Sequence, residues 1–458
     1  MDPPCKEVAE QPSFYLPDEL IEDIFARLPA RSAQRCRCLY RGWAAVLSSR
    51  SFVERHLRLA NRTGSSGTGS NPPSKEAAEQ PSFYLPDELI EDIFARLPAR
   101  SAQRCRCLSL GWAAALSSRS FVDRHLRLAN RRDGSRSRSL FFLPDYDSIT
   151  DTAPHAWSPG RPLVTVRCDD ERLRHVAAVT RQCRGLVVLE ASRPPDVLDN
   201  YFSGPHSSSR PVLNHYVCNP STGQMTALPK GKEAFGVWPH NHDSLGIGYD
   251  ASIQKHKPDR EMPPGFATDY CTDQSVFAQG HLYWGAQPHR KFNYERVIIY
   301  FSITDEVFGI LPPPPVQHLY PCRITELDSR LCLFNNTDSY ERGFDIWVLH
   351  DHGAGTWGIR CRIDLHSASL AGRRFTCSSR IIPLDIVDDG SHILLRPDPY
   401  GIRKENSGAH QLYVYNPATG DVEDLLADGG IISHHTVARR VAVPYEESLE
   451  PTGFSDTK

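Results

Sequence analysis

The sequence predicts a multidomain protein with an α part and an all-β part: two small helical modules come first, and a β-propeller-like domain follows. A stretch of 57 residues near the N-terminus occurs twice, with apolar residues at helical spacing. After Leu140, short runs of β-forming residues recur between turn signals rich in proline and glycine. Hydrophobic residues make up 40% of the 458 residues, which is enough to fill a core in each part.

The internal repeat is the clearest feature of the sequence. Lys6–Arg62 aligns without gaps on Lys75–Arg131, at an offset of 69 residues. Two copies this similar indicate a recent duplication, whereas a solenoid needs three or more units to stack. Each copy is therefore expected to fold alone or with a partner. The five pairs that differ are Val8/Ala77, Tyr40/Ser109, Arg41/Leu110, Val46/Ala115 and Glu54/Asp123.

Each copy contains the pattern of four short helices. In copy one, the first helix begins at Leu16–Glu19 (Leu-Pro-Asp-Glu), where proline and acidic residues suit a first helical turn. Apolar residues follow at helical spacing as far as Leu28, and Pro29 ends the segment. Three more helices are expected: one capped by Ser32 and running through Leu39, one carrying Trp43 and Leu47, and one at Ser51–Asn61.

The helical modules have more large apolar side chains than they can bury. A domain of roughly 50 residues buries a low fraction of its surface, so part of the apolar face is expected to meet a partner. The order Leu-Pro-Asp-Glu-Leu-Ile, Leu-Pro, Arg-Cys-Arg-Cys-Leu, Trp and Phe-Val occurs in both copies. This order resembles the F-box of substrate adaptors in cullin-based ubiquitin ligases.

The resemblance implies that these helices dock on a Skp-type adaptor and, through it, reach a cullin. The contact residues that it implies are Leu16, Pro17, Leu20, Ile21, Ile24, Leu28, Arg35, Leu39, Trp43 and Leu47 in copy one, and Leu85, Pro86, Leu89, Ile90, Ile93, Leu97, Arg104, Leu108, Trp112 and Leu116 in copy two.

The two copies differ just before their tryptophans. The F-box family usually has a small residue followed by a basic one; copy one reads Tyr40-Arg41-Gly42 and copy two Ser109-Leu110-Gly111, so each keeps one feature. The charge of Arg41 slightly favours copy one, although copy two lies beside the following domain, as the family arrangement expects. Which copy docks is an open alternative, and one productive F-box beside a spare one is expected.

A sequence motif, here called the repeated phrase, recurs in the second half of the chain. Tyr216–Gly223 recurs as Tyr413–Gly420, 197 residues later, which is close to four units of about 49 residues and suits four-stranded blades. Asn-Pro ends the first strand of the phrase, and Gly takes the positive-φ position that lets the second strand return. Phe301–Phe308 and Trp347–Trp357 are variants of the phrase.

These phrases resemble the F-box-associated β-propeller found behind the F-box in many plant proteins, and the resemblance covers most of residues 139–445. Cys183–Val187, Gly246–Asp250, Gly280–Trp284 and Pro383–Val387 fall in the family's order. One departure is Pro258–Asp273, which is short and polar where the family continues with further strands. About half a blade is therefore expected to be missing.

The predicted organisation has seven parts. They are a disordered N-terminus (1–13), F-box copy one (14–61), a flexible linker (62–82), F-box copy two (83–130), a basic linker (131–138), the propeller (139–445) and a disordered tail (446–458).

Charge and composition limit the functional classes. With 52 basic and 55 acidic residues, the net charge of −3 gives no bulk reason to bind nucleic acid or an anionic membrane. The sequence shows no apolar run of roughly 20 residues and no signal-peptide core. We therefore expect the protein to be located in the cytoplasm, the nucleus or both. The thirteen cysteines are odd in number and scattered, which favours thiols over a disulfide framework.

Motifs for catalysis or metal binding are not evident. Cys36-Arg37-Cys38 and Cys105-Arg106-Cys107 lack the usual zinc spacing and a second ligand pair. The sequence contains no nucleophile elbow, Walker loop or dinucleotide fingerprint. We therefore expect a non-catalytic adaptor without cofactor or metal, which binds a protein substrate on its propeller face. The alternatives are a decayed duplicate that binds the Skp adaptor without a working substrate domain, and a propeller lectin or enzyme with a helical arm.

Overall fold

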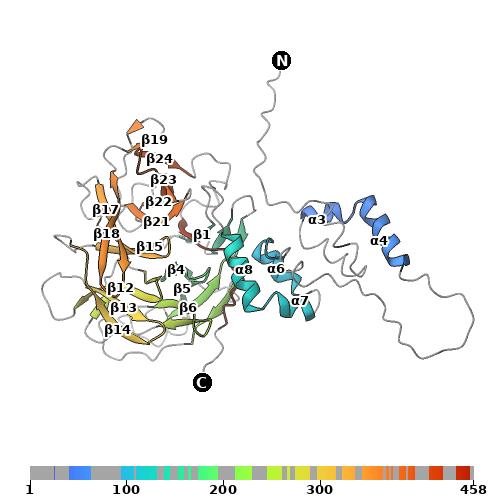
Figure 1. Cartoon of the computed structure of the whole chain (residues 1–458), viewed down its shortest axis with the longest axis horizontal. Helices are drawn as coiled ribbons and strands as arrows, with labels where there is room; N and C mark the ends of the chain where they lie inside the picture. The colour runs from blue at the N-terminus through green and yellow to red at the C-terminus, as the bar shows by residue number, and fades with distance from the viewer. Residues whose placement is uncertain are drawn as a thin grey trace, which may run out of the picture. The chain divides into compact units, whose positions relative to one another are not determined.

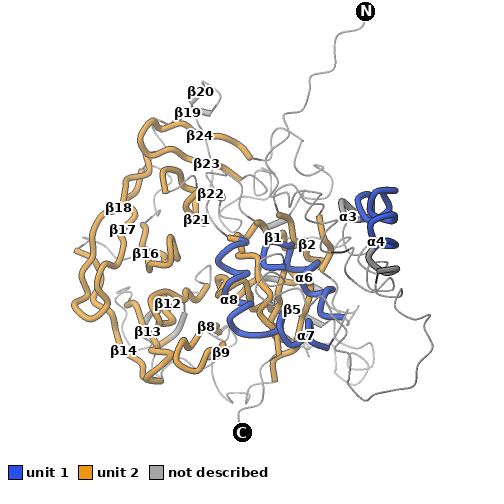
Figure 2. Tube along the Cα trace, turned by 45° about the vertical axis from the view of Figure 1, so that its right-hand side comes forward, with its two compact units in different colours: residues 1–129 blue, residues 130–458 orange. Residues whose placement is uncertain are grey.

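The computed structural model describes residues 25, 41–62, 94–107, 110–130, 139–144, 153–158, 163–166, 174–193, 212–229, 245–259, 266–268, 274–288, 297–315, 322–335, 343–364, 368–370, 373–374, 381–387, 390–397, 412–425 and 440–453. The chain divides into two compact units, residues 1–129 and 130–458, drawn in blue and orange in Figure 2. The first unit holds the repeated helical region, and the second holds the β domain. Within the described ranges, no helix combines the length and apolar character that crossing a membrane requires.

The described helices of the first unit follow the repeat. Copy one contributes α3 and α4, and copy two contributes α6, α7 and α8 (Figure 1). The helices expected around Trp43 and at Ser51–Asn61 are confirmed by α3 and α4, while the helix expected at Ser32–Leu39 lies outside the described residues. The bounds are α3 Arg41–Val46, α4 Arg50–Arg62, α6 Ala99–Cys105, α7 Leu110–Ala115 and α8 Arg119–Ala129.

Serine caps the last helix of each copy. Ser49 Oγ accepts a hydrogen bond from the Phe52 N–H at 3.1 Å, and Ser118 Oγ accepts one from the Phe121 N–H at 3.3 Å. The expected cap of the second helix differs in the copy where it can be observed. There α6 follows Pro98, and Ser101, the counterpart of Ser32, lies inside the helix. Pro98 is the N-cap residue, and its carbonyl accepts hydrogen bonds from the N–H groups of Ser101 and Ala102 at 2.8 and 2.9 Å.

The second unit is a propeller of five blades, with a two-stranded sheet between the second and third blades. Figure 1 shows the sheets following one another around a common centre in chain order. Neighbouring sheets touch at β1 and β4, β5 and β8, β8 and β11, β11 and β15, β15 and β21, and β21 and β25. The fold class predicted from the sequence is thus confirmed.

The strands are distributed over the sheets as follows. The first blade has β1 Leu140–Pro144, β2 His155–Trp157, β3 Val164–Thr165 and β25 Arg440–Pro444; the second has β4 Arg174–Ala178, β5 Val187–Arg193, β6 Val212–Asn219 and β7 Gln224–Ala227; the two-stranded sheet has β8 Gly246–Asp250 and β9 Lys255–Asp259. The third has β10 Phe266–Thr268, β11 Val276–Ala278, β12 His281–Pro288, β13 Val297–Ser302 and β14 Val307–Leu311; the fourth has β15 Cys322–Leu327, β16 Arg330–Asn335, β17 Gly343–Asp351 and β18 Thr356–Asp364; the fifth has β19 Ser369–Leu370, β20 Arg373–Arg374, β21 Ile381–Val387, β22 His392–Pro397, β23 Tyr413–Tyr415 and β24 Asp421–Asp424.

The repeated phrases form the hairpin of the third and fourth strands in four blades, and in the fifth blade β19 pairs with β24 outside this hairpin. The two full phrases are β6–β7 and β23–β24, and the two variants are β13–β14 and β17–β18. Gly223 and Gly420 adopt φ values of 76° and 77°, as their turn chemistry predicts, and each donates its N–H to the Asn carbonyl four residues earlier. Apolar side chains of neighbouring sheets then pack face to face and form the core.

The two-stranded sheet lies where the sequence predicts an incomplete blade, although the stretch Pro258–Asp273 itself contains the end of β9 and all of β10. It consists of β8 and β9, and among the described residues no third strand joins it. At this point the second and third blades meet directly, because Thr180 and Ser275 form a parallel bridge and the Arg181 N–H donates to the Ser275 carbonyl at 3.1 Å. The ring therefore closes past the short blade through main-chain hydrogen bonds.

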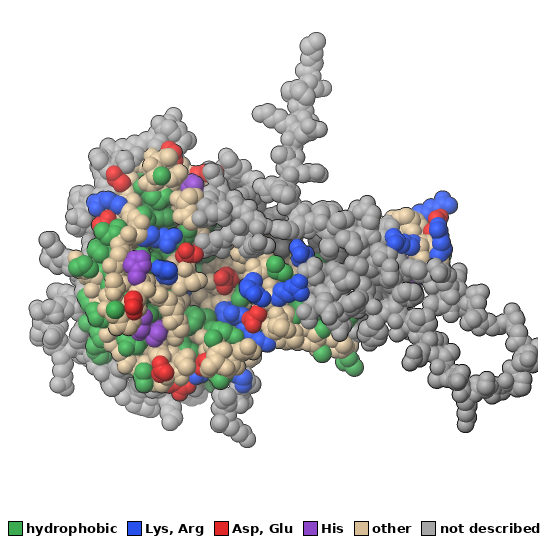
Figure 3. Space-filling model, viewed as in Figure 1, with side chains coloured by type: hydrophobic (Ala, Val, Ile, Leu, Met, Phe, Trp, Pro, Cys, Tyr) green, Lys and Arg blue, Asp and Glu red, His purple; other side chains and the backbone are tan. Residues whose placement is uncertain are grey.

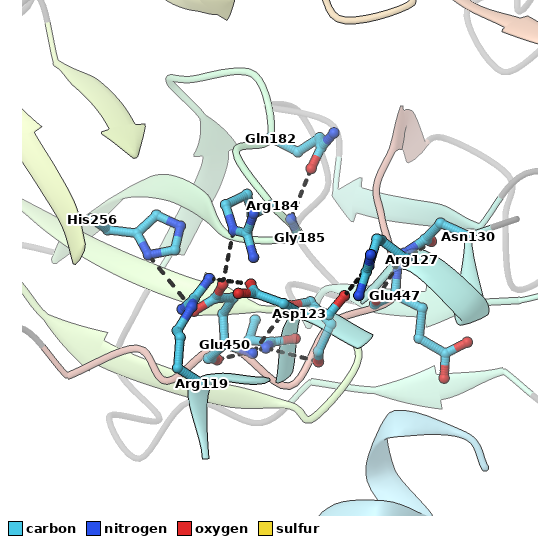
Figure 4. Close-up of polar contacts among 12 residues, drawn as sticks. Arg119, Asp123, Arg127, Asn130, Gln182, Arg184, Gly185, His256, Glu447 and Glu450 are labelled. Carbon is cyan, nitrogen blue, oxygen red and sulfur yellow. Dashed lines mark hydrogen bonds and ion pairs between the residues drawn. The ribbon is translucent and has the colours of Figure 1, made fainter. Parts of the chain in front are cut away.

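The C-terminal segment joins the first and second blades. After β25 has paired with β1, residues 445–453 continue along the second blade, where Asn219 donates to the carbonyls of Ser448 at 3.1 Å and Glu450 at 2.8 Å. Arg184 forms a 2.9 Å ion pair with Glu450, whose side chain is buried (Figure 4). The sequence predicts a disordered tail at 446–458, but residues 446–453 pack against the propeller, because their polar groups find partners on distant turns.

The hydrogen bonds from Asn219 to the C-terminal segment are here called the clasp. The repeated phrase supplies a matched pair of asparagines for testing it. Asn219 is buried and holds the C-terminal segment, whereas Asn416 in the same phrase is partly exposed, and its side chain accepts a hydrogen bond from Ala418 in its own turn. We expect Asn219→Ala to lower the free energy of unfolding by about 2–4 kcal/mol and Asn416→Ala by about 1 kcal/mol or less, measured by urea unfolding. Equal losses would contradict the clasp.

Candidate docking site

Copy two is a helical module held together by hydrogen bonds between its segments. His125 on α8 is fully buried, and its Nε2 donates to the Leu97 carbonyl at 2.9 Å. The Arg106 guanidinium, just after α6, donates from Nε and Nη2 to the Leu116 carbonyl at 3.1 and 2.7 Å. The hydrogen bonds therefore tie α8 to the segment before α6, and the end of α6 to the end of α7.

Apolar contacts support the same arrangement. The Trp112 ring on α7 packs edge-on against Phe94, with ring centroids 4.9 Å apart. Phe94 and Leu97, before α6, and Leu116, after α7, are buried as well. Such edge-to-face aromatic pairs stabilise a small module by roughly 0.5–1.5 kcal/mol beyond the area that they bury.

Six of the twenty predicted contact residues lie in the described ranges. Leu47, Leu97 and Leu116 are buried, with exposed fractions of 0%, 7% and 0%. Arg104 is exposed and Trp112 is half-buried, and Trp43 lies on α3. Docking by any of the twenty remains a prediction. The other fourteen fall outside the described residues: Leu16, Pro17, Leu20, Ile21, Ile24, Leu28, Arg35, Leu39, Leu85, Pro86, Leu89, Ile90, Ile93 and Leu108.

The last helix of each copy has nearly the same sequence but a different exposure. On α8, Val122 and Leu126 are 4% and 8% exposed, whereas their counterparts Val53 and Leu57 on α4 are 40% and 53% exposed. The exposure of these residues could not be deduced from the sequence, which is identical at these positions. These two positions are therefore covered on α8 and exposed on α4, although Phe52 on α4 is buried like Phe121 on α8.

Helix α7 carries an apolar side chain that the sequence reasoning did not single out as a contact. Leu110 is 92% exposed, the highest value among the exposed large hydrophobic residues described. Copy one has Arg41 at this position. The replacement of a basic residue by an apolar one was therefore the sequence difference that could have drawn attention to Leu110. The fold of the module does not need leucine here, because the side chain contacts little else.

The inner strands of the propeller bring together charged side chains. Arg181, after β4, lies near Glu326 on β15 and Asp385 on β21, and its guanidinium donates to the carbonyls of Pro383 and Leu384 at 3.4 Å. Burial, and after it the neighbouring carboxylate of Asp385, together raise the pKa of Glu326 from 4.5 to about 7. This carboxyl group therefore titrates near neutral pH.

Neither unit contains a described metal site. Cys105 is buried and Cys107 is exposed, so these two thiols do not share an environment. Among the described residues, no group of three or more His, Cys, Asp or Glu side chains is placed to hold a metal ion. On the face of the propeller drawn in Figure 3, side chains of both charges are interspersed with apolar ones.

Comparison with protein families identifies both parts of the chain. The F-box domain matches residues 14–55 and 83–124, and the F-box associated beta propeller domain matches residues 254–381. The two F-box matches coincide with the two repeat copies. The propeller match spans the region from the turn of the two-stranded sheet to the start of β21.

Curated relatives come from Arabidopsis thaliana. The putative F-box protein At1g12855 is 40% identical over 327 residues, which cover 62% of this chain and 68% of that protein. The putative F-box/kelch-repeat protein At1g12870 is 22% identical and covers 62% of this chain and 72% of that protein. The putative F-box protein At4g17780 is 23% identical and covers 82% of this chain and 89% of that protein.

Two solved structures with which the chain was compared are distant. An acylaminoacyl peptidase from Pyrococcus horikoshii has a TM-score of 0.28 at 11% identity, covering 56% of this chain and 39% of the peptidase. A putative 6-phosphogluconolactonase from Bacteroides fragilis has a TM-score of 0.25 at 9% identity, covering 70% of this chain and 98% of that protein.

The buried histidine of copy two has a matched control in copy one. His125→Ala removes a buried hydrogen bond and leaves a cavity, so we expect a local loss of about 2 kcal/mol and roughly 30-fold faster amide exchange in α8. His56→Ala, on the partly exposed α4, should leave exchange in α8 unchanged. Hydrogen exchange followed by mass spectrometry measures both variants. Unchanged exchange in His125→Ala would contradict the role assigned to this hydrogen bond.

The raised pKa of Glu326 predicts a pH-dependent stability. The folded state binds a proton up to about pH 7 and the unfolded chain only up to about pH 4.5, so this group stabilises the fold at low pH and the stabilisation is lost as pH rises through 7. Glu326→Gln should therefore be more stable than wild type at about pH 8 and similar to it at about pH 4.5. Urea unfolding at both pH values tests this, and a variant that is destabilised at pH 8 would contradict it.

Proposed function

The chain belongs to the F-box protein family, and on this premise we propose that it is the substrate-recognition adaptor of a Skp–cullin–F-box ubiquitin ligase. The observation that carries the proposal is the combination, in one chain, of F-box sequences with an F-box-associated propeller. An adaptor needs one surface for the ligase and another for the substrate. The two units of this chain supply one domain for each task.

The helical modules are proposed to bind the Skp-type adaptor, and the cullin is reached through it. Support comes from the two F-box matches and from the packed helices of copy two, which give a partner a preformed surface. An interface that is already rigid loses less conformational entropy when it binds. The proposed contacts are the residues that the F-box resemblance implies.

The propeller is proposed to bind a protein substrate through loops on one of its faces. Loops carried on a rigid frame can vary in sequence without loss of the fold, and the five packed blades supply such a frame. The bound substrate would be held near the ubiquitin-conjugating enzyme that the cullin recruits. The chain would then contribute proximity and orientation, while bond chemistry is left to the conjugating enzyme.

A decayed substrate domain is disfavoured by the packing of the propeller. Core clusters lie between neighbouring sheets, and the C-terminal strand closes the ring although one blade is short. F-box proteins are generally non-catalytic adaptors, which supports the same role here. For such an adaptor we propose a location in the cytoplasm, the nucleus or both.

A pull-down with a purified Skp-type adaptor tests the docking role. The variants are Leu20→Ala/Ile24→Ala in copy one, Leu89→Ala/Ile93→Ala in copy two, and all four changes together. Each truncated side chain that is buried in the interface should cost about 2–4 kcal/mol, so the quadruple variant should lose the adaptor. The double variant in the productive copy should lose it as well.

The same experiment separates docking from folding. Each variant is checked by thermal melting of the propeller, which these changes in the helical region should leave unaltered. If the quadruple variant retains the adaptor like wild type, the docking assignment is wrong.

A further inference from the structure

The third blade exposes an apolar outer strand. Five of the large hydrophobic residues described in the propeller are exposed, and three of them lie on β14: Val307, Phe308 and Ile310, at 53%, 38% and 56%. The strand Val307–Leu311 carries no charged residue. It is the outermost strand of its sheet (Figure 1), and among the described residues it pairs with β13 alone. Alternate residues of β14 therefore turn their main-chain N–H and C=O groups away from the sheet.

The short blade explains why this surface is open. Phe308 packs on Phe301 with ring centroids 4.8 Å apart and lies 6.3 Å from the Trp284 ring, so these aromatic rings share one side of the third blade. That side faces the two-stranded sheet, because a Cβ atom added at Gly246 on β8 would lie 3.0 Å from Trp284. Ile310 shares the side of Phe308, two residues before it. In the described part of the chain, the two-stranded sheet has no outer strands that could cover them.

The last strands of the other repeated phrases are closed, each in a different way. In the fifth blade, β24 pairs in parallel with β19. In the second blade, β7 lies beside the C-terminal segment, where the hydroxyl oxygens of Thr226 and Thr452 are 2.6 Å apart. In the fourth blade, β18 has a bulge at Arg360, since the register passes from Cys361 directly to Ile359. A bulge and a charge both hinder the addition of a strand. The pairing of β14 with β13 is regular, so β14 is open to a further strand.

The chemistry of this edge indicates what binds there. A row of main-chain donors and acceptors between apolar side chains is complemented by an extended peptide chain, which supplies both kinds of group. The pairing of β19 with β24 shows that the last strand of this phrase accepts a further strand in the same propeller. A rigid second copy of the chain fits less well. Three partly exposed side chains offer on the order of 300 Å² of apolar surface, whereas each partner of a stable complex buries about 800 Å².

We propose that the free edge of β14 is a docking site for an extended, uncharged segment of a protein partner. The segment joins the third blade as an added strand and packs apolar side chains on Phe308 and Ile310. Under the proposed function, on which the identity of the partner rests, this protein is the substrate of the ligase. Main-chain pairing supplies the affinity, and the apolar side chains supply the specificity. The substrates selected at this site are proteins that present an unpaired β-forming segment.

Fluorescence anisotropy of the full chain with a labelled probe peptide tests the site. The probe alternates valine and threonine and carries lysine outside the strand. Its control has the same sequence with an N-methyl group on every amide of the strand, which removes the hydrogen-bond donors. The probe should bind, and the N-methylated control should bind about ten-fold more weakly or not at all.

Two variants of equal exposure locate the binding site. Ile310→Lys places a charge on the edge of β14 and should weaken binding of the probe about ten-fold. Ile359→Lys on β18 is the matched control, because Ile359 is also 56% exposed, and it should change binding less than about two-fold. Melting temperatures of both variants should equal that of wild type, since the replaced side chains are exposed.

The outcomes separate this inference from the proposed function. Absence of probe binding, equal binding of the N-methylated peptide, or equal weakening by the two lysine variants would each overturn the β14 site. Binding of the Skp-type adaptor is measured on the same samples. If the adaptor binds and the probe does not, the β14 site falls and the docking role stands; if only the probe binds, the β14 site stands and the adaptor role falls. If Ile310→Lys abolishes self-association in sedimentation and leaves probe binding intact, β14 pairs with a second copy and the proposal is overturned.

Discussion

Closure of the ring is the constraint on which the rest of the propeller depends. The first blade is complete only when β25, at the C-terminal end, pairs with β1 about 300 residues earlier. Every blade packs on two neighbours, so an open ring would expose the apolar faces at the break. The segment after β25 reinforces this closure, because Asn219 and Arg184 of the second blade bind Ser448 and Glu450.

The same constraint explains how a short blade is tolerated. A two-stranded sheet covers less of its neighbours than a four-stranded blade, yet the ring needs contact only along the inner strands in order to close. The parallel bridge between Thr180 and Ser275 supplies that contact by joining the second and third blades directly. Among the described residues the two-stranded sheet has no outer strands, and the centre of the propeller is nevertheless continuous.

Local chemistry was predictable from the sequence, whereas long-range partners were not. The Asn-Pro and Gly turn phrase predicted the outer hairpins because its φ requirement is local, and the short polar stretch from Pro258 predicted the incomplete blade. The packed segment at 446–453 was missed, since its partners lie more than 200 residues away. The raised pKa of Glu326 depends on burial and on the Asp385 carboxylate of the neighbouring blade. The different exposure of Val122 and Leu126 from that of Val53 and Leu57 depends on packing that the two copies do not share.

In the proposed adaptor role, the small helices would bind the ligase and the large rigid frame would bind the substrate. The two copies of the helical module differ in the residues just before their tryptophans and in the exposure of their last helices, and a single docking event remains the prediction. Native mass spectrometry of the full chain with excess purified Skp-type adaptor tests this account most directly. It predicts the mass of one chain plus one adaptor, and detection of the free chain alone would contradict it.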